Sequence, residues 1–287
     1  MFDTLFSNPS VMIQGITGTH GSFHTRAMID AGTRIVCGVT PGKGGHKVYD
    51  VPVYSSAAEA RSHHAIDVTV IFVPAPFALS AINEAIDADI RMIICITEGI
   101  PVNDMLAALQ HAHEKGAQII GPNCPGILIP GITKLGIIPA IVGTPGNVAL
   151  VSRSGTLTYE AAASLTAAGI GQRIIVGIGG DALTGTSFVE CLKYFEIDPN
   201  IGKIVLIGEI GGQDEQLAAE YIKTNVHKPV FAYIVGHSAP PSTKLGHAGA
   251  IMGAESESAA VKTTVLNHAG AVTANSLPEL IAKIVAS

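Results

Sequence analysis

Short apolar runs alternate with helix-like segments along the first 123 residues of the chain. The runs are rich in Val and Ile, and the segments between them repeat apolar positions every three or four residues. A strand, a helix and another strand at this spacing are typical of a parallel sheet with crossover helices. We therefore predict strands within residues 11–15, 34–40, 51–54, 67–73, 91–97 and 118–123, and helices within 22–32, 57–64, 77–89 and 102–116.

The alternation stops over residues 124–146, which are rich in Pro and Gly and show no sustained helical period. It restarts at residue 147 with a second series of apolar runs and amphipathic segments. The pattern predicts an α/β domain over residues 1–123, a connector over 124–146 and a second α/β domain over 147–287.

Composition narrows the class of protein. Of the 287 residues, 47% are hydrophobic and 14% are charged, which suits buried sheets and not a disordered chain. The net charge of −6, with Lys and Arg scattered, argues against nucleic-acid binding. Four dispersed cysteines without a C-x-x-C pair indicate neither a zinc site nor a disulfide framework.

The sequence shows neither a membrane-spanning pattern nor a targeting pattern. The most apolar stretch, residues 68–82, is interrupted by Pro74 and Pro76 before it reaches the roughly 20 residues that a membrane span needs. The first residues have neither a secretory nor a transit-peptide pattern. We expect a cytosolic chain with no membrane segment.

The first predicted strand runs into glycines at positions 15, 18 and 21. Such a turn lets a backbone approach a phosphate, although the spacing differs from the dinucleotide motif G-x-G-x-x-G. After the second strand, where an NAD site would carry an acid, the chain has Lys43. A basic residue fits a phosphorylated ribose, as in NADP or coenzyme A, and the alternative is a turn with a solvated lysine.

Two more strand ends of this domain carry distinctive loops. They read "ITEGIP" from Ile96 and "GPNCPG" from Gly121, and their position at one sheet edge favours a shared ligand crevice. Cys124 has an alternative interpretation as a buried structural thiol. His20 and His24 have the i, i+4 spacing of metal ligands, but no acidic or Cys cluster accompanies them, so we predict no metal site in this chain.

In the second half, "VSRSGTLTYE" takes a strand into a helix through Ser154, Gly155 and Thr156, whose hydroxyls and N–H groups suit an anion. A plain N-cap explains Ser154 equally well. Glu209 ends another strand, where its carboxylate can orient an imidazole or complement the next helix. A slim loop of Gly and Ala surrounds His247, so a catalytic imidazole and a structural one are equally consistent with the sequence here.

Seven segments, in order, resemble the alpha subunits of succinyl-CoA synthetase, also called succinate–CoA ligase: "GVTPGKGG", "ITEGIP", "GPNCPG", "VSRSGTLTYE", "GIGGD", "GEIGG" and "GHAGAI". The resemblance implies an N-terminal Rossmann-like CoA-binding domain followed by a flavodoxin-like ligase domain. It also implies a beta subunit with an ATP-grasp domain, which binds ATP or GTP with Mg²⁺.

The resemblance implies roles for individual residues. His247 would be phosphorylated, Glu209 would steady the phosphoimidazole, and the phosphate would rest on Ser154, Gly155 and Thr156. Coenzyme A would contact Thr17, Gly18, Thr19, His20, Lys43, Ile96, Thr97 and Glu98, with Asn123 and Cys124 near its thiol end. Tyr159 would face the acid substrate, or would simply pack as a helix aromatic.

Other readings remain open at this point. Malate– and citrate–CoA ligases share most of these motifs. A serine hydrolase built on Ser154 and His247 would need the elbow G-x-S-x-G, which is absent. A non-catalytic CoA-binding regulator would need the first domain alone. Glu255 and Glu257 depart from the usual pattern of this family after the histidine loop.

Overall fold

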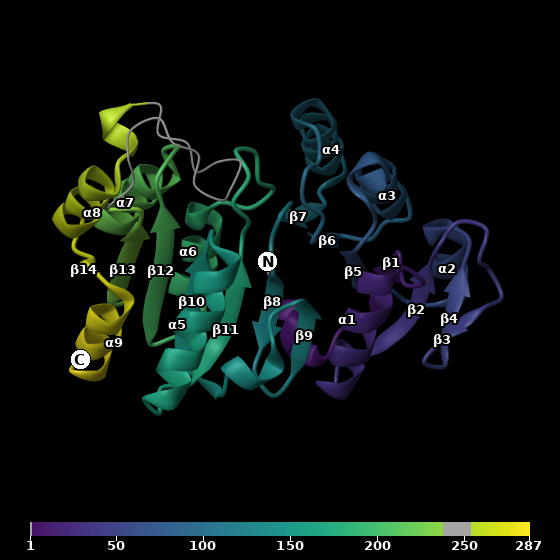
Figure 1. The fold of residues 1–287 in the computed structure, drawn as a ribbon, viewed down its shortest axis with the longest axis horizontal. Helices are drawn as coiled ribbons and strands as arrows, with labels where there is room; N and C mark the ends of the chain where they lie inside the picture. Colours follow the sequence, from purple (N-terminus) through teal and green to yellow (C-terminus); the bar gives the residue numbers. More distant parts are fainter. Residues whose placement is uncertain (1, 238–253) are drawn as a thin grey trace. The chain divides into compact units, whose positions relative to one another are not determined.

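The computed structural model describes residues 2–237 and 254–287. Contacts within the chain divide it into two units, with the division between Ile138 and Pro139. Unit 1 comprises the residues before this point and unit 2 those after it. Both units contain a mainly parallel sheet with alternating helices, which confirms the predicted α/β class (Figure 1).

The sheet of unit 1 has the strand order β3-β4-β2-β1-β5-β6-β7. All its pairings are parallel except that of β3 with β4. β1, β5 and β6 are buried at every position, as parallel strands covered on both faces must be. The strands are β1 (Val11–Gln14), β2 (Ile35–Val39), β3 (Lys47–Val48), β4 (Val51–Tyr54), β5 (Val68–Ile71), β6 (Met92–Cys95) and β7 (Gln118–Ile120).

The helices of unit 1 are α1 (Thr19–Asp30), α2 (Ala57–His63), α3 (Ala75–Asp87) and α4 (Val102–Lys115), preceded by the short η1 (Asp3–Ser7). α3 and α4 start directly after Pro74 and Pro101, and α4 ends at Gly116 with φ of 67°. α3 packs against both α2 and α4, while α1 lies against β1 and β2. Strand order reverses between β1 and β5, which makes their carboxyl ends the expected ligand crevice.

The predicted connector is more regular than its composition suggests. It contains an antiparallel hairpin of β8 (Gly126–Ile129) and β9 (Thr133–Gly136), both buried, and the short η2 (Ala140–Val142). Glycine makes this pairing possible, because a Cβ on Gly126 would lie 2.0 Å from the carbonyl oxygen of Leu135. The Pro and Gly residues thus permit close strand contact here, where the sequence analysis expected a loop.

The sheet of unit 2 contains the strands β14-β13-β12-β10-β11 in this order, all parallel. The order is that of flavodoxin-like sheets, and it reverses between β10 and β12. The strands are β10 (Pro145–Ser152), β11 (Gln172–Gly177), β12 (Lys203–Glu209), β13 (Val230–Val235) and β14 (Val272–Ala274). The carboxyl ends of β10 and β12 therefore form the expected ligand crevice of this unit.

Five helices accompany this sheet in the described residues: α5 (Gly155–Ala167), α6 (Phe188–Ile197), α7 (Asp214–Asn225), α8 (Ala259–His268) and α9 (Leu277–Val285), with the short η3 (Glu255–Glu257) before α8. α5 packs against α9, and α7 packs against both α6 and α8. Side chains of Ser154, Ser187, Ser258 and Ser276 cap four of the helices.

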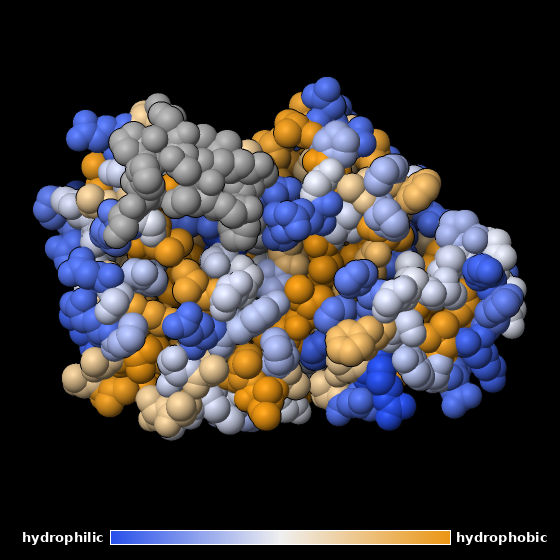
Figure 2. All heavy atoms as spheres, in the orientation of Figure 1, coloured by the Kyte–Doolittle hydropathy of each residue, from blue (hydrophilic) through white to orange (hydrophobic). Residues whose placement is uncertain are grey.

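The surface is chemically mixed on the face drawn in Figure 2, where hydrophilic residues in blue alternate with hydrophobic residues in orange. In residues 2–237 and 254–287, no helix combines the length and the hydropathy that crossing a bilayer requires.

Candidate functional site

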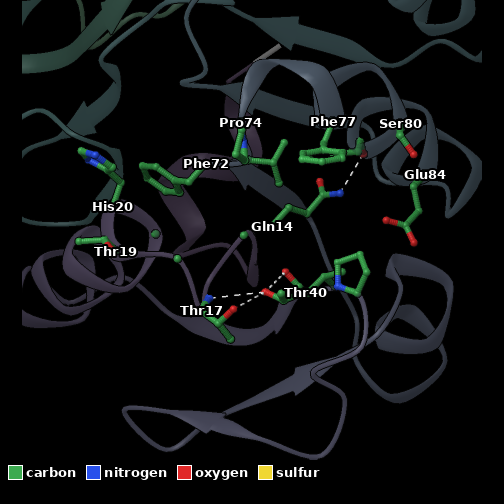
Figure 3. A pocket seen from close by; sticks show the side chains of 17 residues that line it. Gln14, Thr17, Thr19, His20, Thr40, Phe72, Pro74, Phe77, Ser80 and Glu84 are labelled. Carbon is green, nitrogen blue, oxygen red and sulfur yellow. Dashed lines mark hydrogen bonds between the residues drawn. The ribbon is translucent and has the colours of Figure 1, made fainter.

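A pocket of about 560 Å³ opens at the carboxyl ends of β1, β2 and β5 in unit 1. Figure 3 shows the side chains around it. Gln14 and Thr40 come from the ends of β1 and β2, Phe72 and Pro74 follow β5, and Phe77, Ser80 and Glu84 come from α3. The predicted cofactor residues Thr17, Gly18, Thr19 and His20 line it on the side of α1.

The glycine-rich turn forms one wall of this pocket. Gly15 has φ of 81°, and its carbonyl oxygen accepts the N–H of Gly18 at 3.0 Å. Gly21, in the first turn of α1, faces the same carbonyl so closely that a Cβ would lie 2.2 Å from it. No side chain caps this helix at Gly18, so its first N–H groups and its positive dipole end are available to an anion.

Hydrogen bonds fix the other walls. The hydroxyl of Thr17 donates to that of Thr40 at 3.1 Å, and the Thr40 hydroxyl donates to the carbonyl of Val39 at 2.9 Å (Figure 3). The buried amide of Gln14 donates to the carbonyl of Ala81 at 2.8 Å and accepts from Thr69 at 3.0 Å. The side-chain amide of Gln14 is thus engaged with protein, and the lining offers a ligand apolar side chains, hydroxyls, the His20 imidazole and the Glu84 carboxylate.

A second cavity of about 500 Å³ shares His20, Phe72, Val73 and Pro74 with the first. The predicted residues Ile96, Thr97 and Glu98 line it from the loop after β6. The structure therefore brings both predicted groups, 17–20 and 96–98, around adjoining cavities that suit an elongated ligand.

His24 lines this second cavity, a position that the sequence analysis did not assign. Its ring stacks on Phe72 with centroids 5.5 Å apart and planes 8° apart. Burial, with the positive charge of Lys134 and then His20, lowers the pKa of His24 from 6.5 to about 4. The imidazole is therefore neutral near pH 7 and offers the cavity one donor and one acceptor. The i, i+4 spacing of His20 and His24 was the only feature of the sequence that pointed to a role for His24.

Lys43 lies outside both cavity linings. It is exposed in the turn after β2, where its N–H donates to the carbonyl of Thr40 at 3.0 Å. Thr40 itself lines the first pocket, so Lys43 is three residues from the site.

Asn123 and Cys124 follow the last parallel strand of unit 1. Asn123 has φ of 51°, and its N–H donates to the carbonyl of Thr97, which ties this loop to the second cavity. Cys124 is buried, and its thiol donates to the carbonyl of Cys95 at 3.3 Å. This burial agrees with the structural-thiol alternative, and neither residue lines the two cavities.

In unit 2 the predicted anion site lies at the start of α5, directly after β10. The Ser154 hydroxyl accepts the N–H of Leu157 at 3.3 Å, so Ser154 is a true N-cap. Among the described residues, a Cβ on Gly155 would meet no atom within 4 Å, and Thr156 is exposed. The described part of the chain therefore leaves room for a ligand at this turn. Tyr159 lies half-buried on the same helix.

Glu209 ends β12, the strand beside β10, and is 3% exposed. Its carboxylate lies 3.5 Å from the guanidinium of Arg153, the residue just before the Ser154 cap. The structure thus brings the predicted residues Glu209 and Ser154 to one edge of the sheet, where the strand order reverses. His247 lies outside the described residues.

Three buried charges beside Glu209 were missed by the sequence analysis: Arg153, Glu215 and Lys262. Arg153 directly follows an apolar strand, which is a weak signal for a buried cation. Glu215 and Lys262 read as ordinary helix-surface residues, because only the packing of α7 and α8 places them inside.

Comparisons with known proteins agree on one class. Residues 6–99 match the CoA binding domain family and residues 151–272 the CoA-ligase family. The chain is 53% identical to "Succinate--CoA ligase [ADP-forming] subunit alpha 2" of Archaeoglobus fulgidus over 277 residues, which cover 96% of each chain. It is 49% identical to the protein "Succinate--CoA ligase [ADP-forming] subunit alpha" of Staphylococcus epidermidis, over 95% of this chain and 90% of that one.

A solved structure of ATP citrate lyase from Methanothrix soehngenii, in complex with citrate and coenzyme A, superposes with a TM-score of 0.88 at 26% identity. The match covers 97% of this chain but only 50% of the lyase chain, so this chain spans about half the length of that protein.

Proposed function

The chain belongs to the family of succinate–CoA ligase alpha subunits, and we propose that with a beta subunit it converts succinate, coenzyme A and a nucleoside triphosphate to succinyl-CoA, the diphosphate and phosphate. The enzyme is an acid–thiol ligase. The nucleotide, ATP or GTP, and Mg²⁺ belong to the beta subunit in this proposal, and the reaction is reversible.

The position of Glu209 and the Ser154 turn at the same edge of the sheet is the observation that supports the proposal. One anion-binding helix start and one buried carboxylate lie at the same strand-order reversal, and Arg153 joins them. A carboxylate at this point suits an imidazole that becomes positively charged or phosphorylated, and the helix start suits the phosphate. His247 is the imidazole in this proposal.

The reaction then divides into three displacements. A nitrogen of His247 attacks the γ-phosphorus of the nucleotide, and the P–O bond to the nucleoside diphosphate breaks. A succinate carboxylate oxygen takes the phosphoryl group from His247, giving succinyl phosphate. The thiolate of coenzyme A attacks the acyl carbon and phosphate leaves.

The described residues have separate tasks in these steps. The N–H groups of Gly155 and Thr156 and the hydroxyl of Ser154 hold the transferring phosphoryl group, and Glu209 orients His247. Tyr159 contacts the acid. Coenzyme A lies along the adjoining cavities, whose linings include Thr17, Gly18, Thr19, His20, Ile96, Thr97 and Glu98. Lys43, from outside both linings, contacts its phosphates, and its thiol end points toward Asn123 and Cys124.

The similarity to ATP citrate lyase supports citrate as a second candidate acid. Thioester formation with succinate, malate and citrate, measured on the purified complex with coenzyme A and either ATP or GTP, decides between them. We expect succinate to be used at least tenfold faster than the other two acids, and the chain without its partner to be inactive. Preference for citrate or malate would overturn the acid assignment, and absence of any thioester would overturn the activity.

A further inference from the structure

Four ionic side chains are buried together at the end of β12 and define what we call the ionic cluster: Arg153, Glu209, Glu215 and Lys262. Each is 3% exposed or less. They come from four separate places, since Arg153 follows β10, Glu209 ends β12, Glu215 lies in the first turn of α7 and Lys262 lies on α8. Only Glu209 has a role in the proposed reaction.

Glu215 is the centre of the ionic cluster. One oxygen of its carboxylate accepts the backbone N–H of Glu209 at 3.1 Å and the Arg153 guanidinium at 3.3 Å. The other oxygen pairs with the ammonium of Lys262. Glu215 therefore holds the main chain of Glu209, and two cations in turn hold Glu215.

Lys262, on α8, binds the main chain at and just after Glu209. Its ammonium donates to the carbonyl of Glu209 at 2.8 Å and to that of Gly211 at 2.6 Å, so with Glu215 all three N–H groups are used. Arg153 also donates to the Gly211 carbonyl, at 3.0 Å. Both backbone groups of Glu209 are thus bonded to charged side chains, which makes its position rigid.

Burial of the ionic cluster carries a large desolvation free energy. Burying ions costs more than burying apolar groups of the same volume, and such clusters are often replaceable without loss of stability. Burial lowers the pKa of Lys262 and Glu215 opposes this shift; for Arg153, burial lowers the pKa but the carboxylates of Glu215 and Glu209 outweigh it. The arrangement is therefore more costly than stability alone requires.

The segment before α8, which includes Ser256 and Glu257, is hydrogen-bonded to the chain that follows Glu209. The N–H of Gly211 donates to the carbonyl of Glu257 at 3.1 Å, and the amide of Gln216 donates to that of Ser256 at 2.7 Å. The position of Glu209 is therefore coupled to α8 through its Lys262 contact and through this segment.

We propose that Glu215 and Lys262 are positioning residues: they fix the main chain of Glu209 so that its carboxylate keeps the direction that phosphoryl transfer to and from the imidazole requires. This inference rests on the proposed function of Glu209. Glu215 also binds Arg153 and so prevents the guanidinium from pairing more closely with Glu209. A closer pair would change the direction of the Glu209 carboxylate.

Two variants of the complex with the beta subunit separate positioning from stability. Glu215→Asp keeps the charge but withdraws the carboxylate by about one C–C bond from the N–H of Glu209. The double variant Glu215→Gln with Lys262→Met removes both charges at similar volume, which preserves or restores stability. A matched control, Glu279→Gln with Lys283→Met, removes a partly exposed ion pair of the same unit.

The readouts are the melting temperature, the rate of chain phosphorylation by the nucleotide and the affinity for coenzyme A. We expect both cluster variants to melt near the wild type and to bind coenzyme A within twofold of it, but to be phosphorylated at least tenfold more slowly. The control should match the wild type in all three.

Wild-type phosphorylation rates in folded cluster variants would overturn the inference while leaving the proposed function intact. Failure of both variants to fold would overturn it too, since the ionic cluster would then be holding the fold. If the wild type itself takes no phosphate, the proposed function fails instead.

Discussion

Gly21→Ala tests whether the glycine-rich turn of unit 1 is built for a ligand. A Cβ at Gly21 would lie 2.2 Å from the carbonyl oxygen of Gly15 and 2.9 Å from its carbon, all of them main-chain or rigid atoms. Non-bonded heavy atoms keep about 3.5 Å apart, so the turn must move by about 1 Å. The Gly15 carbonyl also accepts the N–H of Gly18, and that bond would weaken.

The magnitude follows from these contacts. Overpacking of this kind costs about 1–3 kcal/mol of folding free energy. A 1 Å displacement of the first N–H groups of α1 removes about one hydrogen bond to a charged phosphate, which is worth about 1.5–3 kcal/mol. At about 1.4 kcal/mol for each factor of ten, coenzyme A should bind roughly tenfold to a hundredfold more weakly.

Isothermal titration of coenzyme A into the purified complex, well below its melting temperature, measures this loss. Gly155→Ala is the control, because a Cβ there meets no atom of residues 2–237 and 254–287 within 4 Å and the residue lies in the other unit. Its affinity for coenzyme A should equal that of the wild type. Wild-type affinity in Gly21→Ala would refute the reasoning that this turn holds the ligand.

Two further predictions concern unit 1. Lys43→Glu should weaken coenzyme A binding on the order of tenfold at low salt, because the new carboxylate near the pocket repels the phosphates of coenzyme A. Phosphorylation of the chain by ATP should stay intact. An equal loss of coenzyme A binding and of phosphorylation would show that Lys43 has a structural role. Burial lowers the pKa of His24 in the folded chain from the ordinary 6.5 to about 4, so the unfolded chain binds the proton more readily. The contribution of His24 to stability is therefore full above pH 6.5 and is lost as the pH falls toward 4. Denaturant unfolding at pH 7 and pH 4.5 should show a smaller loss in His24→Gln, by on the order of 1 kcal/mol after allowance for partial exposure. Equal losses in both proteins would show that His24 is not buried as a neutral imidazole.

The alternation of apolar runs and amphipathic segments was enough to predict the two α/β units, because parallel strands are buried on both faces and read as continuous Val and Ile runs. It did not predict the β8–β9 hairpin. There the glycines that usually mark loops serve a different purpose, since Gly126 lies where only a bare Cα fits against Leu135. Local composition does not distinguish these two uses of glycine.

The sequence predicted which candidate residues lie together at strand ends, and their roles stay predictions. Residues 17–20 and 96–98 line adjoining cavities, and Glu209 lies beside Arg153, the residue before the Ser154 cap. Lys262 was not predictable, because nothing in the sequence of α8 distinguishes a buried lysine from a solvated one. Its burial depends on Glu215 of α7, 47 residues away, and such a pairing exists only in the tertiary structure.

The transfer of phosphate to His247 is the central claim, and labelling tests it most directly. The complex with the beta subunit is incubated with Mg²⁺ and ATP or GTP labelled at the γ-phosphate, and the label on this chain is then followed in acid and in base. We predict an acid-labile, base-stable phosphate on the wild-type chain and none on His247→Asn. Label that persists on the His247→Asn chain would contradict the account.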